Sequence, residues 1–293
     1  MTLTHSHLSA KKLMDQHIML HSAMGDSIVA FRHVIKFSEE NQEKKINLIY
    51  NGLIDQFIRY WLWPDNINLM PLNQTVHDVD NLHSFPYQCE DQDIIDAFNN
   101  KAANAHDFRP LYIHTEHEPI KDNNLQEIIP DKAPLLFGLG DYVVVQPIST
   151  QYTHRYINEE LDTYEKFLHE LIDQIHMHTP YSVVTVGTHD DAEKFPHLKV
   201  KNSFSRFFNL MGPLSIEEYC DTLKYSKAVL GFNSSAVNIG SYIFDKPVAS
   251  WTLWDKGCSF FNDFIDVEKS LANNECRPWE KEMSYYTDFL KKL

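Results

Sequence analysis

Apolar positions along the chain alternate between short continuous runs and longer stretches with helical spacing. The first run covers residues 17–21 and precedes a helical pattern over residues 28–35. A second run covers residues 45–50 and precedes an amphipathic pattern over residues 53–58. Short buried runs are typical of strands, and a 3.6-residue spacing is typical of helices. The alternation predicts βαβ units and a parallel sheet.

This pattern weakens between residues 73 and 107, where Asn, Asp and His are frequent. One helix is predicted near residues 93–102, and a short strand is predicted at residues 111–114. The polar stretch 116–132 is expected to form loop and short helix. We therefore expect the first domain to be irregular in its second half.

A regular pattern begins again at Asp141. Strands are predicted over residues 142–147, 181–187, 228–231 and 247–250, and helices over residues 159–175, 215–223 and 235–243. Continuous apolar strands between helices are typical of a doubly wound α/β domain. The tail, residues 260–293, carries helical patterning and is long enough to reach back across a partner domain.

Length and composition support a folded, two-domain protein. The chain has 293 residues, of which 43% are hydrophobic and 13% aromatic, enough to bury a sizeable core. Its 41 acidic and 26 basic residues give a formal charge of −15, which repels phosphate backbones and anionic lipid. General nucleic-acid binding and membrane-surface binding are therefore disfavoured.

Cysteine usage and hydropathy bear on the cellular location. The four cysteines lie far apart and form no CxxC pair, so neither a zinc site nor a disulfide framework is indicated. No apolar segment typical of a signal peptide and no run long enough for a membrane span occur. We therefore expect a cytoplasmic protein without a transmembrane segment.

The first of three candidate ligand loops follows the first predicted strand. It contains Met24, Gly25 and Asp26 and opens a helix. Ligands of open α/β sheets bind at the carboxyl ends of the strands, and helix N-termini favour anions. Asp26 is thus either the N-cap of this helix or a carboxylate that faces a cleft.

The other two candidate loops follow strands in the second half. Residues 146–150 end in Ser149 and Thr150, whose hydroxyls could hold phosphate oxygens, and Arg155 follows within reach. Residues 231–238 link a strand to a helix and could direct backbone N–H groups at an anion. A solvated polar loop and ordinary N-capping are the alternatives for these two loops.

Six short segments, in this order, resemble the heptosyltransferase-like glycosyltransferases of family 9. They are Met24-Gly25-Asp26-Ser27 and residues 146–150, 184–187, 209–215, 228–235 and 245–248. The similarity is continuous from about Tyr142 to Trp254, and in the first half it rests mainly on the Gly-Asp loop. The resemblance implies an α/β GT-B architecture, with two Rossmann-like domains whose parallel sheets face a central cleft. Residues 1–137 would form the acceptor-side domain, and residues 138–293 the nucleotide-sugar-binding domain.

The resemblance also implies roles for individual residues. Asp26 would be the general base, with Met24 and Gly25 beside it on the acceptor side. The candidate donor-binding residues are Ser149, Thr150, Arg155, Gly187, Leu210, Gly212, Ser215, Asn233, Ser234 and Ser235. Among these, Ser149 and Thr150 would contact the diphosphate, and Arg155 is the candidate cation near it. Leu210, Gly212 and Ser215 would border the nucleotide base, whereas Asn233, Ser234 and Ser235 would contact sugar and phosphate.

The implied activity is a metal-independent, inverting transfer from a nucleotide-diphosphate sugar, which is a substrate and not a cofactor. A glycan, a lipid-linked sugar or a protein could be the acceptor. The chain departs from the family pattern, because Asn233 and Asn238 stand where an aspartate and a histidine are common. A non-catalytic nucleotide-sugar or glycan-binding protein and a nucleotide-sugar epimerase are therefore the alternatives.

Two acidic or histidine-rich segments have the composition of a metal site. Asp190 and Asp191 are the nearest approach to a DxD pair, and residues 114–118 combine histidine with glutamate. In a chain with 16 histidines such clusters arise by chance. No metal site is predicted.

Overall fold

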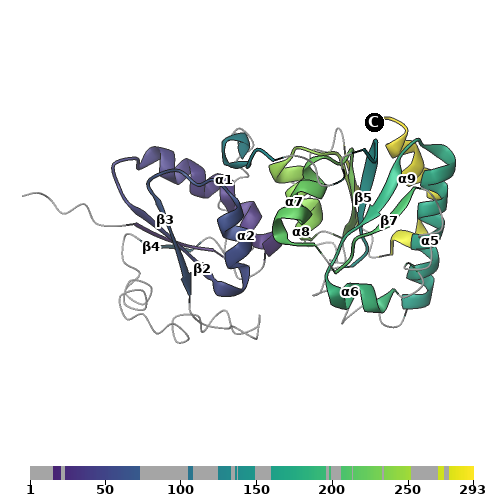
Figure 1. Cartoon of the computed structure of the whole chain (residues 1–293), viewed down its shortest axis with the longest axis horizontal. Coiled ribbons are helices and arrows are strands. Elements are labelled where there is room, and N and C mark those ends of the chain that lie inside the picture. Colours follow the sequence, from purple (N-terminus) through teal and green to yellow (C-terminus); the bar gives the residue numbers. More distant parts are fainter. Residues whose placement is uncertain are drawn as a thin grey trace, which may run out of the picture.

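A computed structural model of the chain contains two parallel sheets, one from each half of the sequence (Figure 1). It describes residues 16–20, 24–72, 105–107, 125–132, 136, 138–148, 160–195, 198, 206–212, 214–232, 234–251, 270–273 and 277–293. The two sheets lie at opposite ends of an elongated molecule, and helices from both halves pack between them (Figure 1).

The first sheet has four parallel strands in the order β3-β2-β1-β4. Its strands are β1 (Gln16–Met19), β2 (Ile46–Asn51), β3 (Ile67–Leu72) and β4 (Ala105–Asp107). Its helical elements are α1 (Met24–Glu40), the 3-10 turn η1 (Gly52–Ile54) and α2 (Asp55–Tyr60). β1, α1 and β2 form the βαβ unit that the sequence predicts.

The second sheet has six parallel strands in the order β10-β9-β8-β5-β6-β7. Its strands are β5 (Tyr142–Gln146), β6 (Ser182–Thr185), β7 (Phe207–Asn209), β8 (Val229–Phe232), β9 (Val248–Trp251) and β10 (Leu271–Asn273). Its helices are α5 (Leu161–His178), α6 (His189–Lys194), α7 (Ile216–Lys224), α8 (Ser235–Asn238), the π-helix η7 (Ile239–Ile243) and α9 (Met283–Leu290). The 3-10 turns η4 (Leu125–Ile128) and η9 (Pro278–Glu280) complete the described elements.

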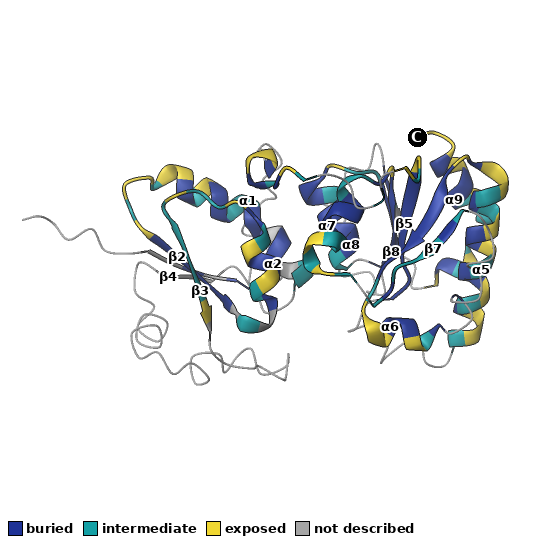
Figure 2. Cartoon of the chain, in the orientation of Figure 1, coloured by how far each residue is buried: buried dark blue, intermediate teal, exposed yellow. Residues whose placement is uncertain are grey.

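Two hydrophobic cores cover the two faces of the second sheet. Successive residues of a strand point to opposite faces. Val144 accordingly belongs to a core that also contains Ile18 and Leu48 of the first sheet, whereas Val143 and Val145 belong to a core beneath α5. The helices between the sheets carry buried residues, drawn dark blue, beside exposed ones, drawn yellow (Figure 2). One continuous core therefore joins the two halves.

The last helix, α9, packs on the second sheet. Its side chains Tyr286, Phe289 and Leu290 are buried in the core beneath α5, and α9 runs beside α5 (Figure 1). The sequence left open that the tail reaches back across the first domain, but α9 does not lie there. The apolar side chains of α9 are buried against the second sheet and α5 instead.

Several observed elements were not predicted from the sequence. The hydrophobic pattern predicted no strand at β3, β4, β7 or β10 and no helix at α6. The predicted helix at residues 93–102 and the predicted strand at residues 111–114 lie outside the described residues. Among the helices that the structure describes, none has the length and apolar character needed to cross a membrane.

Candidate functional site

The N-termini of α1 and α8 meet at the junction of the two halves. Each helix follows a parallel strand, β1 or β8, so both N-termini stand at carboxyl ends of strands. Asn238 Nδ2 donates a hydrogen bond of 3.4 Å to the carbonyl oxygen of Gly25. A Cβ added to Gly25 would lie 3.2 Å from this Nδ2 and 3.5 Å from the backbone nitrogen of Ser235. Glycine therefore permits this close approach, and the structure brings the first and third candidate loops together.

Asp26 is the third residue of α1. Because the helix already begins at Met24, the N-cap position precedes Met24, and Asp26 lies in the first turn. A carboxylate in the first turn interacts favourably with the positive end of the helix dipole. The side chain of Asp26 lies outside the described residues, so its role as general base stays a prediction. Met24, beside it, is partly buried against the core between the sheets.

Gln146, the last residue of β5, connects this strand to α8. Its Oε1 accepts hydrogen bonds from Ser234 Oγ at 2.6 Å and from the backbone nitrogen of Ala236 at 2.9 Å. Ser234 is the N-cap of α8 but its side chain makes no cap hydrogen bond. The carboxamide of Gln146, which is only 7% exposed, therefore takes over the acceptor role that an N-cap side chain usually has.

Tyr219 of α7 joins the same group of hydrogen bonds. Its hydroxyl lies 2.9 Å from Ser235 Oγ and 3.4 Å from Gln146 Oε1. Burial raises the pKa of Tyr219 well above its ordinary value, so the phenol is protonated at neutral pH. Both serines that the sequence places in the third loop thus hydrogen-bond to protein groups and fix α8 against β5 and α7.

Gly187, Leu210 and Gly212 lie together at the carboxyl ends of β6 and β7. The backbone nitrogen of Gly212 donates to the carbonyl oxygen of Gly187 at 3.0 Å. Gly212 has φ of +96°, and a Cβ there would lie 3.2 Å from the Cα of His189. The left-handed conformation and the close neighbour both require glycine at this turn. The structure therefore brings these three predicted residues together at one edge of the sheet.

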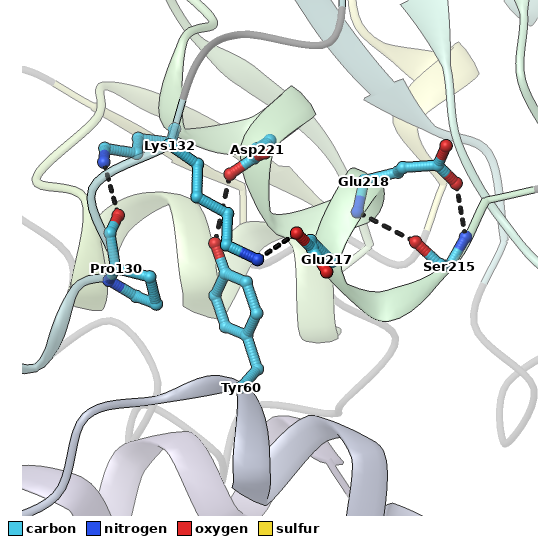
Figure 3. A network of polar contacts seen from close by, with 8 residues as sticks. Tyr60, Pro130, Lys132, Ser215, Glu217, Glu218 and Asp221 are labelled. Atoms are coloured by element: carbon cyan, nitrogen blue, oxygen red, sulfur yellow. Dashed lines mark hydrogen bonds and ion pairs between the residues drawn. The ribbon is translucent and has the colours of Figure 1, made fainter.

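Ser215 caps α7. Its Oγ accepts a hydrogen bond of 3.2 Å from the backbone nitrogen of Glu218, and Glu218 Oε2 accepts one of 2.8 Å from the backbone nitrogen of Ser215 (Figure 3). This capping box is a local signal that the sequence Ser-x-x-Glu carries by itself. The cap explains why serine stands here, and a contact with the nucleotide base stays a prediction.

Asp191 belongs to a second capping box, at the start of α6. Its Oδ2 accepts a hydrogen bond of 2.7 Å from the backbone nitrogen of Thr188, and its own backbone nitrogen donates to Thr188 Oγ1 at 3.3 Å. Burial raises the pKa of Asp191, while the hydrogen bond from Thr188 opposes this shift. Across the part of the chain that is described, no group of three or more His, Cys, Asp or Glu residues could hold a metal ion.

Four of the predicted donor-binding residues lie outside the described residues. They are Ser149, Thr150, Arg155 and Asn233. The histidine-rich segment 114–118 lies outside them as well. Their predicted roles are untested.

A second contact between the halves joins α2 to α7 (Figure 3). The Tyr60 hydroxyl donates a hydrogen bond of 3.1 Å to Asp221 Oδ1. Asp221 is 6% exposed, and burial raises its pKa above the ordinary value of an aspartate, although the hydrogen bond from Tyr60 opposes the shift. Burial also raises the pKa of Tyr60. Tyr60 and Asp221 thus satisfy each other's hydrogen-bonding groups at the interface between the halves.

Lysines of the connecting segment and of α7 surround this pair. Lys132 forms an ion pair with Glu217 and lies with its Nζ 5.7 Å from the ring centroid of Tyr60. Lys224 Nζ donates a hydrogen bond of 2.9 Å to the carbonyl oxygen of Pro130. The segment that leads from the first half to the second is therefore tied to α7 at two points.

A third link between the halves involves α1 and η7. The Arg32 guanidinium lies 4.7 Å above the ring centroid of Tyr242, and its NH2 nitrogen donates to the carbonyl oxygen of Tyr242 at 3.3 Å. The cation–π contact and the hydrogen bond use both features of a guanidinium, its planar face and its edge donors.

Sequence reasoning did not identify Gln146, Tyr219, Tyr60 or Asp221 as functional. Gln146 was part of a segment that carried the family resemblance, and a polar residue that ends an otherwise apolar strand was the available signal. Asp221 lies between Cys220 and Leu223, two buried positions of α7. A carboxylate on the apolar side of a predicted helix was the corresponding signal for an interface.

Comparisons with solved structures bear on the fold of the chain. A family 9 glycosyl transferase from Veillonella parvula matches with a TM-score of 0.60 and 12% identity, over 95% of this chain and 92% of that chain. The E. coli heptosyltransferase WaaC, with ADP-2-deoxy-2-fluoro heptose, matches with a TM-score of 0.59 and 11% identity, over 95% and 99%. A proposed UDP-N-acetylglucosamine 2-epimerase from Listeria monocytogenes matches with a TM-score of 0.55 and 11% identity, over 95% and 88%.

The similarity is one of structure. A scan against protein-family models and a search of curated proteins by sequence gave no match. The structural matches nevertheless extend over nearly all of this chain and of each neighbour. They confirm the α/β fold with parallel sheets that the sequence predicts. The chain therefore has the GT-B fold of the heptosyltransferase-like glycosyltransferases.

Proposed function

We propose that the protein is a metal-independent, inverting glycosyltransferase that moves a sugar from a nucleotide-diphosphate sugar to a hydroxyl acceptor. The observation that carries this proposal is the GT-B fold over 95% of the chain. The meeting of α1 and α8 at carboxyl ends of parallel strands supports it, because open α/β sheets bind their ligands at these ends. The WaaC structure, with ADP-2-deoxy-2-fluoro heptose, makes ADP-heptose the first donor to test.

In the proposed reaction the acceptor oxygen attacks the anomeric carbon, and the bond from that carbon to the diphosphate oxygen breaks. Asp26 takes the proton of the acceptor hydroxyl. Backbone N–H groups, hydroxyls and Arg155 stabilise the negative charge that develops on the leaving diphosphate. In this scheme the chain's own groups hold the diphosphate, which is the basis for proposing metal independence.

The proposal assigns the acceptor to residues 1–137 and the donor to residues 138–293. The donor diphosphate would lie near Ser149 and Thr150, and its sugar near Asn233, Ser234 and Ser235. The nucleotide base would lie near the turn formed by Gly187, Leu210 and Gly212, next to Ser215. A glycan, a lipid-linked sugar or a protein supplies the acceptor hydroxyl, and the reaction takes place in the cytoplasm.

The decisive experiment combines a panel of nucleotide-diphosphate sugars with two variants of α1. We expect wild-type protein to release nucleoside diphosphate from at least one donor when an acceptor is present. Asp26→Asn should lower this transfer by about 100-fold or more and leave nucleotide binding intact. Glu39→Gln, on the exposed end of the same helix, is the matched control and should behave as wild type. Equal turnover by Asp26→Asn overturns its role as the base.

A nucleotide-sugar epimerase is the second candidate, because a proposed 2-epimerase shares the fold over 95% of this chain. The two activities differ in what they need. An epimerase converts the nucleotide sugar without any acceptor, whereas a transferase requires one. Product analysis by nuclear magnetic resonance, with and without acceptor extracts, separates them. Binding without turnover under both conditions would indicate a non-catalytic nucleotide-sugar-binding protein instead.

A further inference from the structure

Helix α1 of the first half is held against α8 and η7 of the second half at two levels. At its first turn, the carbonyl oxygen of Gly25 accepts a hydrogen bond from Asn238 Nδ2. Farther along, the Arg32 guanidinium donates to the carbonyl oxygen of Tyr242 and lies over its ring. Gly25 and Arg32 are seven residues apart in α1, a spacing that places both on one side of the helix. The two contacts therefore belong to one interface along α1.

Asn238 lies directly against the first turn of α1. Its side chain is 6% exposed, and its Nδ2 is 3.4 Å from the carbonyl oxygen of Gly25. A Cβ added to Gly25 would lie only 3.2 Å from this nitrogen, so no side chain of α1 stands between them. A buried amide nitrogen needs an acceptor, and the Gly25 carbonyl supplies one. Asn238 thus helps to set how closely this turn approaches the second half.

The acceptor of this hydrogen bond belongs to the peptide group that joins Gly25 to Asp26. A peptide group is planar and rigid, so the Gly25 carbonyl and the backbone nitrogen of Asp26 move together. A contact that fixes the carbonyl therefore also fixes where the backbone of Asp26 lies. Asn238 is part of α8, so this position is set relative to the second half of the chain.

The proposed reaction makes this position important. It takes the base from the first half and the sugar donor from the second half, so the two reacting groups come from different parts of the fold. A misplacement of about 1 Å at a reacting site lowers a rate by about 100-fold. A direct bond between the halves at the Gly25–Asp26 peptide controls the separation on which the rate depends.

We propose that Asn238 is a positioning residue for Asp26, which it holds in register with the second half through the Gly25 carbonyl. This inference rests on the proposed function, because it takes Asp26 as the base. In the step concerned, the acceptor oxygen bonds to the anomeric carbon, the bond to the diphosphate breaks and the hydroxyl proton passes to the Asp26 carboxylate. Asn238 acts on this step only through the peptide that carries Asp26.

The test is a double-mutant cycle, because a residue that acts through Asp26 must lose its effect when Asp26 is replaced. Its four proteins are wild type, Asn238→Asp, Asp26→Asn and the double variant. Asn238→Asp removes the donor and sets a carboxylate oxygen against the Gly25 carbonyl. The release of nucleoside diphosphate from ADP-heptose and from UDP-N-acetylglucosamine is measured with an acceptor extract, and gives kcat and the KM for the donor.

The matched control lies near the other end of α1. Asn66 Nδ2 also donates to backbone carbonyl oxygens, those of Ser38 and Asn41, each at 3.2 Å. Asn66→Asp makes the same chemical change there, away from Asp26. It should leave kcat as in wild type.

We expect Asn238→Asp to lower kcat by roughly ten- to a hundredfold and to leave the donor KM unchanged. In the Asp26→Asn background the same change should alter kcat by less than about twofold. If Asn238→Asp does not fold, as judged by circular dichroism, Asn238→Leu takes its place. This variant removes the donor without adding a charge, and it should show the same dependence on Asp26.

Other outcomes overturn the inference and identify what failed. Full activity in Asn238→Asp shows that the contact with Gly25 does not position the base. An equal loss in both backgrounds shows that Asn238 acts on the fold in general and not through Asp26. A wild-type protein that turns over no nucleotide-diphosphate sugar overturns the proposed function, and the inference falls with it. The first two results, obtained with an active wild type, overturn the inference alone.

Discussion

The two halves of the protein touch through two kinds of contact, and these differ in the size of the groups that meet. Where α1 meets α8, Gly25 lies beside the backbone of Ser235, and the side-chain amide of Asn238 donates a hydrogen bond to the carbonyl oxygen of Gly25. Where α2 meets α7, long side chains meet, with Tyr60 donating to the buried Asp221. The first contact lies at the carboxyl ends of β1 and β8, whereas the second joins the last residue of α2 to the middle of α7.

This difference indicates that the α1–α8 contact and the α2–α7 contact have different roles. Small residues bring helix N-termini close and leave their surroundings available to a ligand, whereas large buried side chains contribute most of the interface stability. The aromatic packing fits this view, since the rings of Trp61 and Phe244 lie with centroids 6.1 Å apart between the halves. We therefore expect changes at the α1–α8 contact to affect ligand chemistry and changes at the α2–α7 contact to affect stability.

The largest expected effect is that of a bulky side chain between α1 and α8. The Cβ of Gly25→Leu alone would lie 3.2 Å from Asn238 Nδ2 and 3.5 Å from the backbone nitrogen of Ser235, and the rest of the leucine side chain needs further room. The helices must move apart, and a displacement of about 1 Å at a reacting site lowers a rate by about 100-fold. Transfer assays measure this loss. Lys36→Leu, on the exposed side of α1, should retain activity, and full activity in Gly25→Leu would contradict the close contact.

The next effect concerns stability at the α2–α7 contact. Asp221→Ala leaves the Tyr60 hydroxyl without its acceptor, which should lower the free energy of unfolding by about 2 kcal/mol. Glu217→Ala, one turn earlier on α7, removes an exposed ion pair with Lys132 and should cost less than about 1 kcal/mol. Urea denaturation gives both values. Equal losses in the two variants would show that burial of Asp221 is unimportant.

A smaller effect is expected from the other partner of this pair. Tyr60→Phe keeps the ring in the interface and removes only the donor, for a loss of about 1 kcal/mol in the free energy of unfolding. Nucleoside diphosphate affinity should stay as in wild type, because the pair lies away from the strand ends. A variant that loses affinity together with stability would argue against separate roles for the two contacts.

The smallest effect is a change of stability with pH. Burial raises the pKa of Asp221 in the folded protein above its unfolded value of about 3.9. Protonation therefore favours folding, so this contribution is present below the unfolded pKa and is lost as the pH rises through the folded pKa. The free energy of unfolding of Asp221→Asn should rise relative to wild type from about pH 4 toward neutrality. A difference with the opposite slope would contradict the raised pKa.

Local patterns were sufficient for much of the fold. Four strands of the second sheet, β5, β6, β8 and β9, were predicted close to their observed ranges, because a buried parallel strand is apolar at nearly every position, as at Val143, Val144 and Val145. β3 was not predicted because Pro71 interrupts its apolar run. The structure places β3 at the edge of the sheet, where a strand tolerates proline. α6 was missed because its six residues are mostly polar and carry only a capping signal.

The sequence by itself determined the two α/β halves, their parallel strands and the helix start at Ser215, because periodicity and caps depend on residues a few positions apart. It also placed Gly25 and Ser235 in loops after strands. Only the tertiary structure decided that Gln146 reaches Ser234, 88 residues away, and that Tyr60 reaches Asp221, 161 residues away. Such partners depend on how sheets and helices pack, and no local pattern encodes that choice.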